Sequence, residues 1–222
     1  MTLIEGPEIR PLVPGRYVSF PFSEPGSDWC FDAAPPFPSP DLSGCTDTKP
    51  DDSIGITFDV PAGWARVGTG VWPETETSLS PGGAGLSFER GAWLHADPCL
   101  TDERVAKDGA PPDIEVGPTV DDFANAIADH PVLDATTPVD VSLGGYSGKY
   151  LDLQLPADPT GCDAFWPWEP GIYQQGPSER RHLWILDVDG VRVVVESHDY
   201  ATTSAQRRTE LQAIVDSIQI AR

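Results

Sequence analysis

The chain has little of what would let it bind a polyanion or cross a membrane. It contains 14 lysine and arginine residues against 35 aspartate and glutamate residues, so its formal net charge is −21 over 222 residues. Binding to nucleic acid draws affinity from basic side chains that neutralise phosphates, and this balance argues against nucleic acid and against an anionic membrane surface. No stretch approaches the roughly 20 apolar residues that a membrane-spanning helix needs.

The sequence also lacks the spacings that mark common catalytic and metal sites. Neither a dinucleotide-binding glycine motif nor a P-loop occurs. The turn Gly145-Tyr146-Ser147-Gly148 does not have the spacing of a nucleophile elbow, and its glycines are typical of a hairpin turn. No pair of histidines has a spacing that one helix would bring together. We therefore predict no catalytic residue, no metal site and no cofactor. The histidines are His95, His130, His182 and His198.

Three acidic residues lie on or beside one predicted hairpin, namely Asp187, Asp189 and Glu196. Neighbouring carboxylates can perform general acid and base catalysis or bind calcium. However, Asp189 is explained by its turn, and the alternation of the hairpin predicts that its polar side chains face solvent. We therefore interpret these residues as structural.

Four cysteines are present, and none forms a close Cys-x-x-Cys pair, which favours disulfides over metal or redox chemistry. Three pairings are possible. We favour Cys30 with Cys45, which closes a local loop, and Cys99 with Cys162; four reduced structural cysteines are the alternative. Because disulfides persist in oxidising compartments, we predict an extracytoplasmic location. Residues 1–11 contain no leader, so this prediction assumes a leader or anchor upstream, and a cytoplasmic location is the alternative.

The composition, 39% hydrophobic and 22% charged, is typical of a globular protein, and we predict a single domain over residues 1–222. Residues 21–53 are too rich in proline for a helix or a central strand, so we interpret them as a disulfide-closed surface insert. Residues 157–178 form a second, aromatic insert.

Periodicity predicts several strands. Apolar residues alternate over 54–60, and a further strand is expected over 86–94. Residues 139–143 and 151–155 alternate on both sides of a glycine-rich turn and predict a hairpin. The clearest signal is Asp189-Gly190 between two apolar segments, 184–188 and 191–195, because this dipeptide suits a two-residue type I′ turn.

Two helices are expected. Thr119 can cap the first, Asp122 suits a capping box, and Pro131 ends it. Apolar residues at helical spacing predict the second over about 204–218. These elements together predict an α+β fold, in which a mainly antiparallel β-sheet packs against two α-helices as a sandwich.

Five short segments spread over most of residues 12–220 carry a family resemblance. They are Pro14-Gly15-Arg16-Tyr17 with Phe20, Phe58 to Trp64, Gly117 to Asp122, Gly144 to Gly148, and Leu186 to Gly190. They resemble an uncharacterised actinobacterial group of extracytoplasmic domains. The strand ending in Pro61-Ala62-Gly63-Trp64 and a terminal helix ending in Asp216-Ser217-Ile218 are also similar to PsbP-like folds, which include mycobacterial cell-envelope lipoproteins. The resemblance implies a fold and a compartment, and it supplies no active site.

The aromatic insert is the feature that the fold does not require. Phe165, Trp166, Trp168 and Tyr173 follow Cys162 closely, and aromatic loops supply rigid contact area for partners. Burial of the rings beneath a long loop is the structural alternative. We expect a cell-envelope binding or interaction module without catalytic activity, whose partner is an unknown protein, peptide or glycan. A hydrolase acting on cell-envelope material is the alternative.

Overall fold

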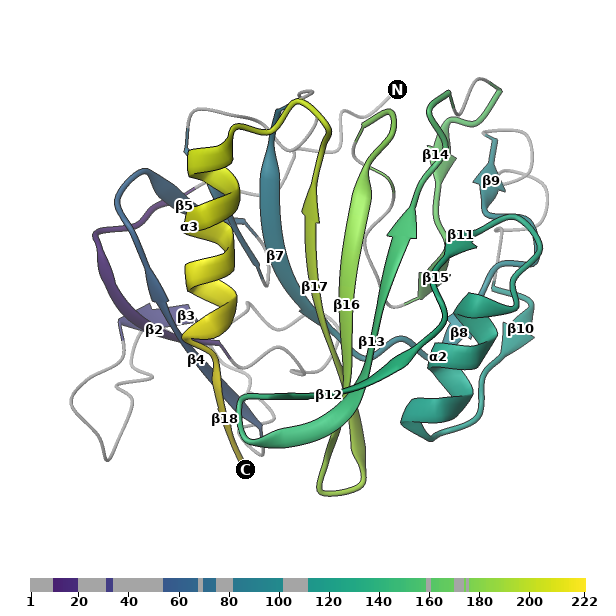
Figure 1. Ribbon diagram of the computed structural model, residues 1–222, viewed down its shortest axis with the longest axis horizontal. Coiled ribbons are helices and arrows are strands. Elements are labelled where there is room, and N and C mark those ends of the chain that lie inside the picture. Colours follow the sequence, from purple (N-terminus) through teal and green to yellow (C-terminus); the bar gives the residue numbers. More distant parts are fainter. Residues whose placement is uncertain are drawn as a thin grey trace, which may run out of the picture.

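The computed structural model of the chain shows a largely antiparallel β protein (Figure 1). It describes residues 10–19, 31–33, 54–67, 70–74, 82–101, 112–158, 161–169, 174 and 176–222. All structural statements below concern these residues. The predicted insert at 21–53, including Cys30 and Cys45, lies almost wholly outside them.

The largest sheet has nine strands, and every pairing within it is antiparallel. Its order is β1 (Arg10–Pro11), β5 (Trp64–Val67), β6 (Gly70–Pro73), β7 (Ala84–Glu89), β17 (Val191–Asp199), β16 (Arg180–Val188), β13 (Tyr146–Gln154) and β11 (Asp134–Ala135), and β12 (Val139–Leu143) also pairs with β13.

Three smaller sheets surround this large sheet. One contains β18 (Gln219–Ala221), β4 (Gly55–Val60), β2 (Gly15–Ser19) and β3 (Phe31–Ala33). The others are β10 (Ile114–Glu115), β8 (Trp93–Leu94) and β15 (Trp168–Glu169), and the pair β14 (Ala164–Phe165) with β9 (Cys99–Leu100). The described part of the chain contains two α-helices, α2 (Val120–Ala128) and α3 (Ala205–Asp216).

The hairpin of β16 and β17 forms the centre of the large sheet. Asp189 and Gly190 both have positive φ, 52° and 85°, which confirms the predicted two-residue turn. Side chains alternate along β16, so Leu186 and Val188 pack on the α3 side of the sheet, whereas Leu183 and Ile185 pack on the α2 side. Both faces of this hairpin are therefore buried over much of its length.

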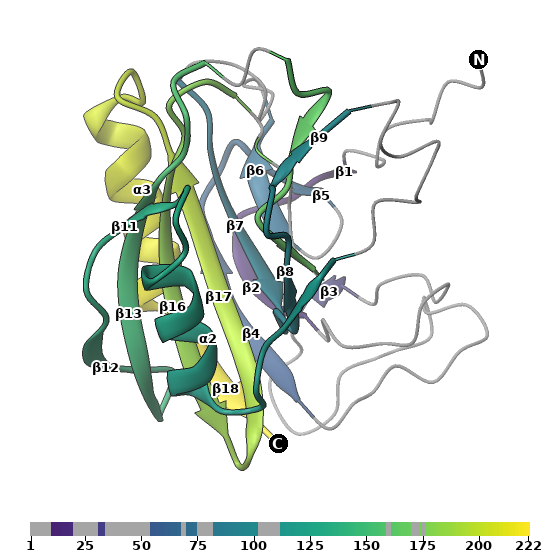
Figure 2. The same ribbon diagram turned by 90° about the vertical axis from the view of Figure 1, so that its right-hand side faces the viewer.

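Two apolar cores result, one on each face of the large sheet. The first joins α3 and β4 to the sheet through residues such as Leu211, Ile214 and Phe58. The second joins α2 to β13 and β16 through Phe123, Ile127 and their neighbours. Figure 2 shows α3 on one side of the sheet and the small strands β8 and β9 on the other.

The predicted fold class is wrong. Among the described residues, the structure is mostly antiparallel sheet, with 48% strand and 14% helix, and it is not an α+β sandwich of one sheet against two helices. The helices have 9 and 12 residues, and much of the surface of the large sheet is covered by other short strands. Four of these strands, β8, β9, β14 and β15, have two residues each, which is too short to produce an alternating pattern in the sequence.

Local signals were more reliable than the predicted layers. Thr119 caps α2, and its hydroxyl and the Asp122 carboxylate form the expected capping box. Helix α3 occupies most of the predicted 204–218 segment, with Ser204 as its N-cap. The hairpin of β12 and β13 turns at Gly144 and Gly145, both with positive φ.

Candidate functional site

The aromatic segment lies on the α2 side of the large sheet, and most of it is buried. Trp168 is fully buried in the core with α2, and Phe165 is 7% exposed. Trp166 is half-buried, with its ring centroid 6.4 Å from that of His95. Tyr173 lies outside the described residues. Trp166 is therefore the one ring of the predicted set that the structure places at the surface.

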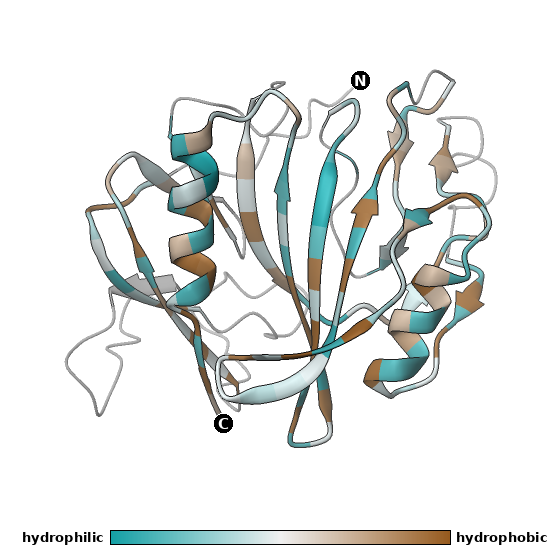
Figure 3. Ribbon diagram, viewed as in Figure 1, coloured by the Kyte–Doolittle hydropathy of each residue, from teal (hydrophilic) through white to brown (hydrophobic). Residues whose placement is uncertain are grey.

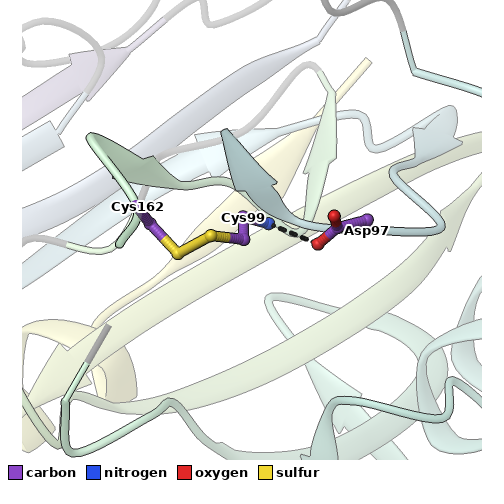
Figure 4. Close-up of a disulfide and its surroundings, with 3 residues drawn as sticks. All are labelled: Asp97, Cys99 and Cys162. Carbon is purple, nitrogen blue, oxygen red and sulfur yellow. Dashed lines mark hydrogen bonds between the residues drawn. A yellow bond between two sulfur atoms is a disulfide. The ribbon is translucent and has the colours of Figure 1, made fainter. Parts of the chain in front are cut away.

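A disulfide joins Cys99 to Cys162, as the sequence predicted (Figure 4). It lies beside the pair of strands β9 and β14, in which Phe165 is opposite Cys99. The Cys99 amide donates a hydrogen bond of 3.0 Å to the Asp97 carboxylate. The bond thus fixes the start of the aromatic segment to β9.

Beneath the aromatic segment, a cluster of charged side chains is buried on the large sheet. Arg181 of β16 is fully buried, with its Nε 2.8 Å from Glu179 Oε1 and its Nη1 3.2 Å from Glu196 Oε1. Glu89 of β7 is the third carboxyl group of the cluster. Three buried carboxyl groups therefore surround one guanidinium group.

The buried tryptophan closes this cluster. Trp168 Nε1 donates a hydrogen bond of 2.9 Å to Glu89 Oε2, and the Arg181 guanidinium lies 5.3 Å from the centre of a Trp168 ring. Ser87 donates a further hydrogen bond of 3.3 Å to Glu89 Oε1. The aromatic segment thus covers the cluster and satisfies part of its hydrogen bonding.

Burial controls the ionisation of this cluster. It raises the pKa of Glu89 and raises that of Glu196 well above the ordinary range, although the positive charge of Arg181 opposes both shifts. The two carboxyl groups lie close enough to share a proton. Burial also lowers the pKa of His198, so its imidazole is neutral at physiological pH.

His198 lies on β17 in the same buried layer as Glu196, two residues earlier. It faces Gly85 of β7, where a Cβ would lie 2.4 Å from His198 Cε1, so this close approach requires glycine. One ligand atom each from Glu179, Glu196 and His198 lies within 4.8 Å of the others. These three residues have the spacing and the donor types to hold a metal ion.

The expectation that the polar residues of this hairpin face solvent is wrong for Glu196, which is fully buried. Sequence reasoning also missed Glu179 and Arg181, because a buried charge in a strand gives the same pattern as an exposed one. Asp187 and Asp189 are exposed near the turn, as predicted.

The opposite face of the same strands carries a second polar group, formed by Tyr150, Asp152, His182 and Trp184. Asp152 is opposite His182, and Tyr150 is opposite Trp184, in the pairing of β13 with β16. His182 Nδ1 lies 2.6 Å from Asp152 Oδ1 and 3.1 Å from the Tyr150 hydroxyl, which donates to the same carboxylate. The Tyr150 and Trp184 ring centroids are 5.1 Å apart.

We call this second group the open face, because solvent reaches it. The side chains of His182 and Asp152 are 28% and 47% exposed. Figure 1 shows α3 to one side of it, and among the described residues no helix lies in front of the middle of β13 and β16. Figure 3 shows that β16 is hydrophilic at its start.

An ion-pair group borders the open face. Asp199 of β17 is nearly buried and pairs with Arg180, whose Nε donates a hydrogen bond of 2.8 Å, and with Arg208 of α3, whose Nε donates one of 2.9 Å.

Burial raises the pKa of Tyr150 above its usual range, and the hydrogen bond to Asp152 adds to this shift. The open face therefore presents a neutral phenol, a carboxylate, an imidazole and an indole ring together.

Comparisons with known proteins do not show which family this chain belongs to. No family model matches it, and no curated protein matches it. Among solved structures, it is similar to LpqN, which is described as involved in cell envelope biogenesis of Mycobacterium tuberculosis, with 11% identity, a TM-score of 0.41, and coverage of 77% of this chain and 85% of that chain. With this identity and TM-score, the similarity establishes neither the fold family nor the role of this chain. The PsbP-like resemblance therefore stays a prediction. In the described part of the chain, no helix has the length and apolar character to span a membrane.

Proposed function

We propose that this protein is an extracytoplasmic binding module that holds a neutral glycan of the cell envelope on the open face, without catalysing a reaction. The observation that carries the proposal is the partly buried ring pair of Tyr150 and Trp184, which lies directly beside Asp152 and His182.

The chemistry of the open face favours a saccharide. Two adjoining rings supply flat apolar area, and neighbouring polar side chains supply donors and acceptors for hydroxyl groups. The net charge of −21 disfavours an anionic polymer as the ligand. Trp168, by contrast, is fully buried, so the aromatic segment offers fewer exposed rings than the sequence suggested.

The disulfide supports an extracytoplasmic location. Cys99 and Cys162 are bonded, and such bonds are rare in reducing compartments. The segments that resemble actinobacterial extracytoplasmic domains favour the same location. Glycans are abundant in a cell envelope, so location and site chemistry agree.

Binding should depend on the open face. We expect the wild-type protein to bind neutral oligosaccharides on a glycan array, and Trp184→Ala or Tyr150→Ala to weaken this binding by about tenfold or more, because each removes a stacking ring. Asp152→Asn keeps the shape of the side chain and tests the polar contact separately. Trp93→Ala is the matched control, since Trp93 is 38% exposed but lies in the small sheet with β10 and β15.

Melting temperatures of all variants would show that each is folded. An array on which the wild-type protein binds no oligosaccharide would contradict the proposal, and so would equal losses in Trp184→Ala and Trp93→Ala. One observation favours the alternative of a hydrolase, because a histidine oriented by a carboxylate at 2.6 Å is a general-base arrangement. New reducing ends released by the wild-type protein but not by Asp152→Asn would establish that alternative.

A further inference from the structure

The buried face of β17 contains the imidazole of His198, which has no hydrogen-bond partner among the described residues. His198 is 1% exposed, and among the described residues neither of its ring nitrogens has a hydrogen-bond partner. Burying a polar group without a partner is unfavourable, and most buried polar groups in native proteins are satisfied. The neutral imidazole therefore presents a lone pair to whatever lies next to it.

Two carboxylates lie next to it. Glu179 and Glu196 are both fully buried, and each has an oxygen within 4.8 Å of the ligand atoms of the other two residues. In the part of the chain that the structure describes, Arg181 approaches one oxygen of Glu196 as an ion pair, and Glu89 lies close enough to share a proton with Glu196. A metal ion at Glu196 would take the place of that proton.

The charge balance of the cluster also favours binding of a cation. Glu89, Glu179 and Glu196 carry up to three negative charges, and Arg181 supplies one positive charge. A divalent ion would neutralise the remaining two without protonating any carboxyl group. Glu89 would remain beside Arg181, and Glu179 Oε2, which accepts a hydrogen bond of 3.2 Å from the Tyr200 hydroxyl, has a second lone pair with which a carboxylate oxygen can bind an ion.

We propose that Glu179, Glu196 and His198 bind a divalent transition-metal ion of the zinc type. One imidazole and two carboxylates form a donor set that suits zinc and its neighbours in the first transition series. Because all three ligands are buried, the ion would serve the fold, and it would bind as the chain folds. This site is on the opposite face from the proposed glycan site and does not depend on it.

The test uses the full chain with its cysteines oxidised. The protein is unfolded, treated with EDTA, and refolded with or without zinc chloride, and zinc per chain is measured by native mass spectrometry and elemental analysis. We expect one zinc ion per chain and a higher melting temperature in zinc. His198→Gln and Glu196→Gln should each lose the bound ion or weaken its affinity by more than about tenfold, and should lose the thermal shift.

His182→Gln is the matched control, because His182 lies on the neighbouring strand but faces the other side of the sheet. It should keep the buried ion. Melting of each variant without zinc shows whether it folds, and Glu196→Gln mimics a protonated carboxyl and should fold well. A wild-type protein that refolds without binding zinc would overturn the proposal, because His198 would then be satisfied by water. Zinc that remains in both His198→Gln and Glu196→Gln would overturn it too, because the ion would lie elsewhere.

Discussion

Replacement of Arg181 by methionine is expected to lower the free energy of unfolding by about 3–5 kcal/mol at neutral pH. Methionine fills much of the same space but leaves Glu89, Glu179 and Glu196 buried without their guanidinium partner. Removing one member of a buried ion-pair group typically has this effect, because the remaining charges cannot recover their hydration. Urea unfolding of metal-free protein, followed by circular dichroism, would measure the change.

Arg180→Met is the matched control for this prediction. Arg180 is the preceding residue on β16, its side chain is 39% exposed, and Asp199 keeps Arg208 as a second partner when Arg180 is removed. Because Arg208 still pairs with the nearly buried Asp199 when Arg180 is removed, we expect the loss to be well below that of Arg181→Met. Equal losses in the two variants would contradict the description of Arg181 as the centre of a buried charged cluster.

The loss of unfolding free energy caused by Arg181→Met should also depend on pH. Without the guanidinium, the buried glutamates hold their protons to higher pH than glutamates of the unfolded chain, which titrate near pH 4.3. The folded state then binds more protons, so stability falls as the pH rises above about 4.3. The difference between Arg181→Met and the wild-type protein should therefore shrink at acidic pH.

Removal of the disulfide is the second change with a large expected effect. The two cysteines are 63 residues apart in the sequence, and the chain-entropy estimate for a loop of this length is about 4 kcal/mol. We expect the double substitution Cys99→Ala and Cys162→Ala to lower the free energy of unfolding by about this amount. The substitution also removes the crosslink beside the pair of strands β9 and β14, and these strands precede the tryptophan that closes the cluster.

Reduction of the wild-type protein with a thiol provides a comparison, because it opens the same bond without changing the sequence. The reduced wild-type protein should be at least as destabilised as the double variant. A loss below about 1 kcal/mol in both would mean that packing of the aromatic segment, rather than the crosslink, holds β9 and β14 in place.

Much of the local structure could be predicted because single residues determine it. Asp189-Gly190 permits the two positive φ values of a tight turn, and Thr119 with Asp122 satisfies the first amides of α2. These interactions span only a few residues, so they can be identified without knowledge of the fold. The disulfide partner of Cys99 was also predicted, although by elimination from a local pairing of Cys30 and Cys45 that the structure does not describe.

The layers could not be predicted because they depend on contacts between distant segments. Strands such as β8 and β15 have two residues each and are held by neighbours that are far away in the sequence. Such short strands have no periodic pattern. The prediction therefore assigned the faces of the large sheet to helices, whereas short strands cover much of them.

Neither polar group could be located from sequence, because each is assembled by strand register. His182 meets Asp152 only when β13 pairs with β16 at one alignment. His198 comes close to Glu179 only because it lies opposite Arg181 in the pairing of β16 with β17. A shift of one residue would exchange the two faces of a strand. The available signal was that ionisable residues gather in 179–182 and 196–199, and this does not say which face of each strand is buried.

The most direct test of glycan binding on the open face is a nitrogen-15 NMR titration that follows the indole N–H signals of the seven tryptophans. The titrant is the oligosaccharide that the wild-type protein retains most strongly on the array. Binding at the open face predicts that the Trp184 signal shifts in a saturable way while those of Trp93 and Trp166 stay in place. Shifts confined to Trp166, or the absence of any saturable shift, would contradict it.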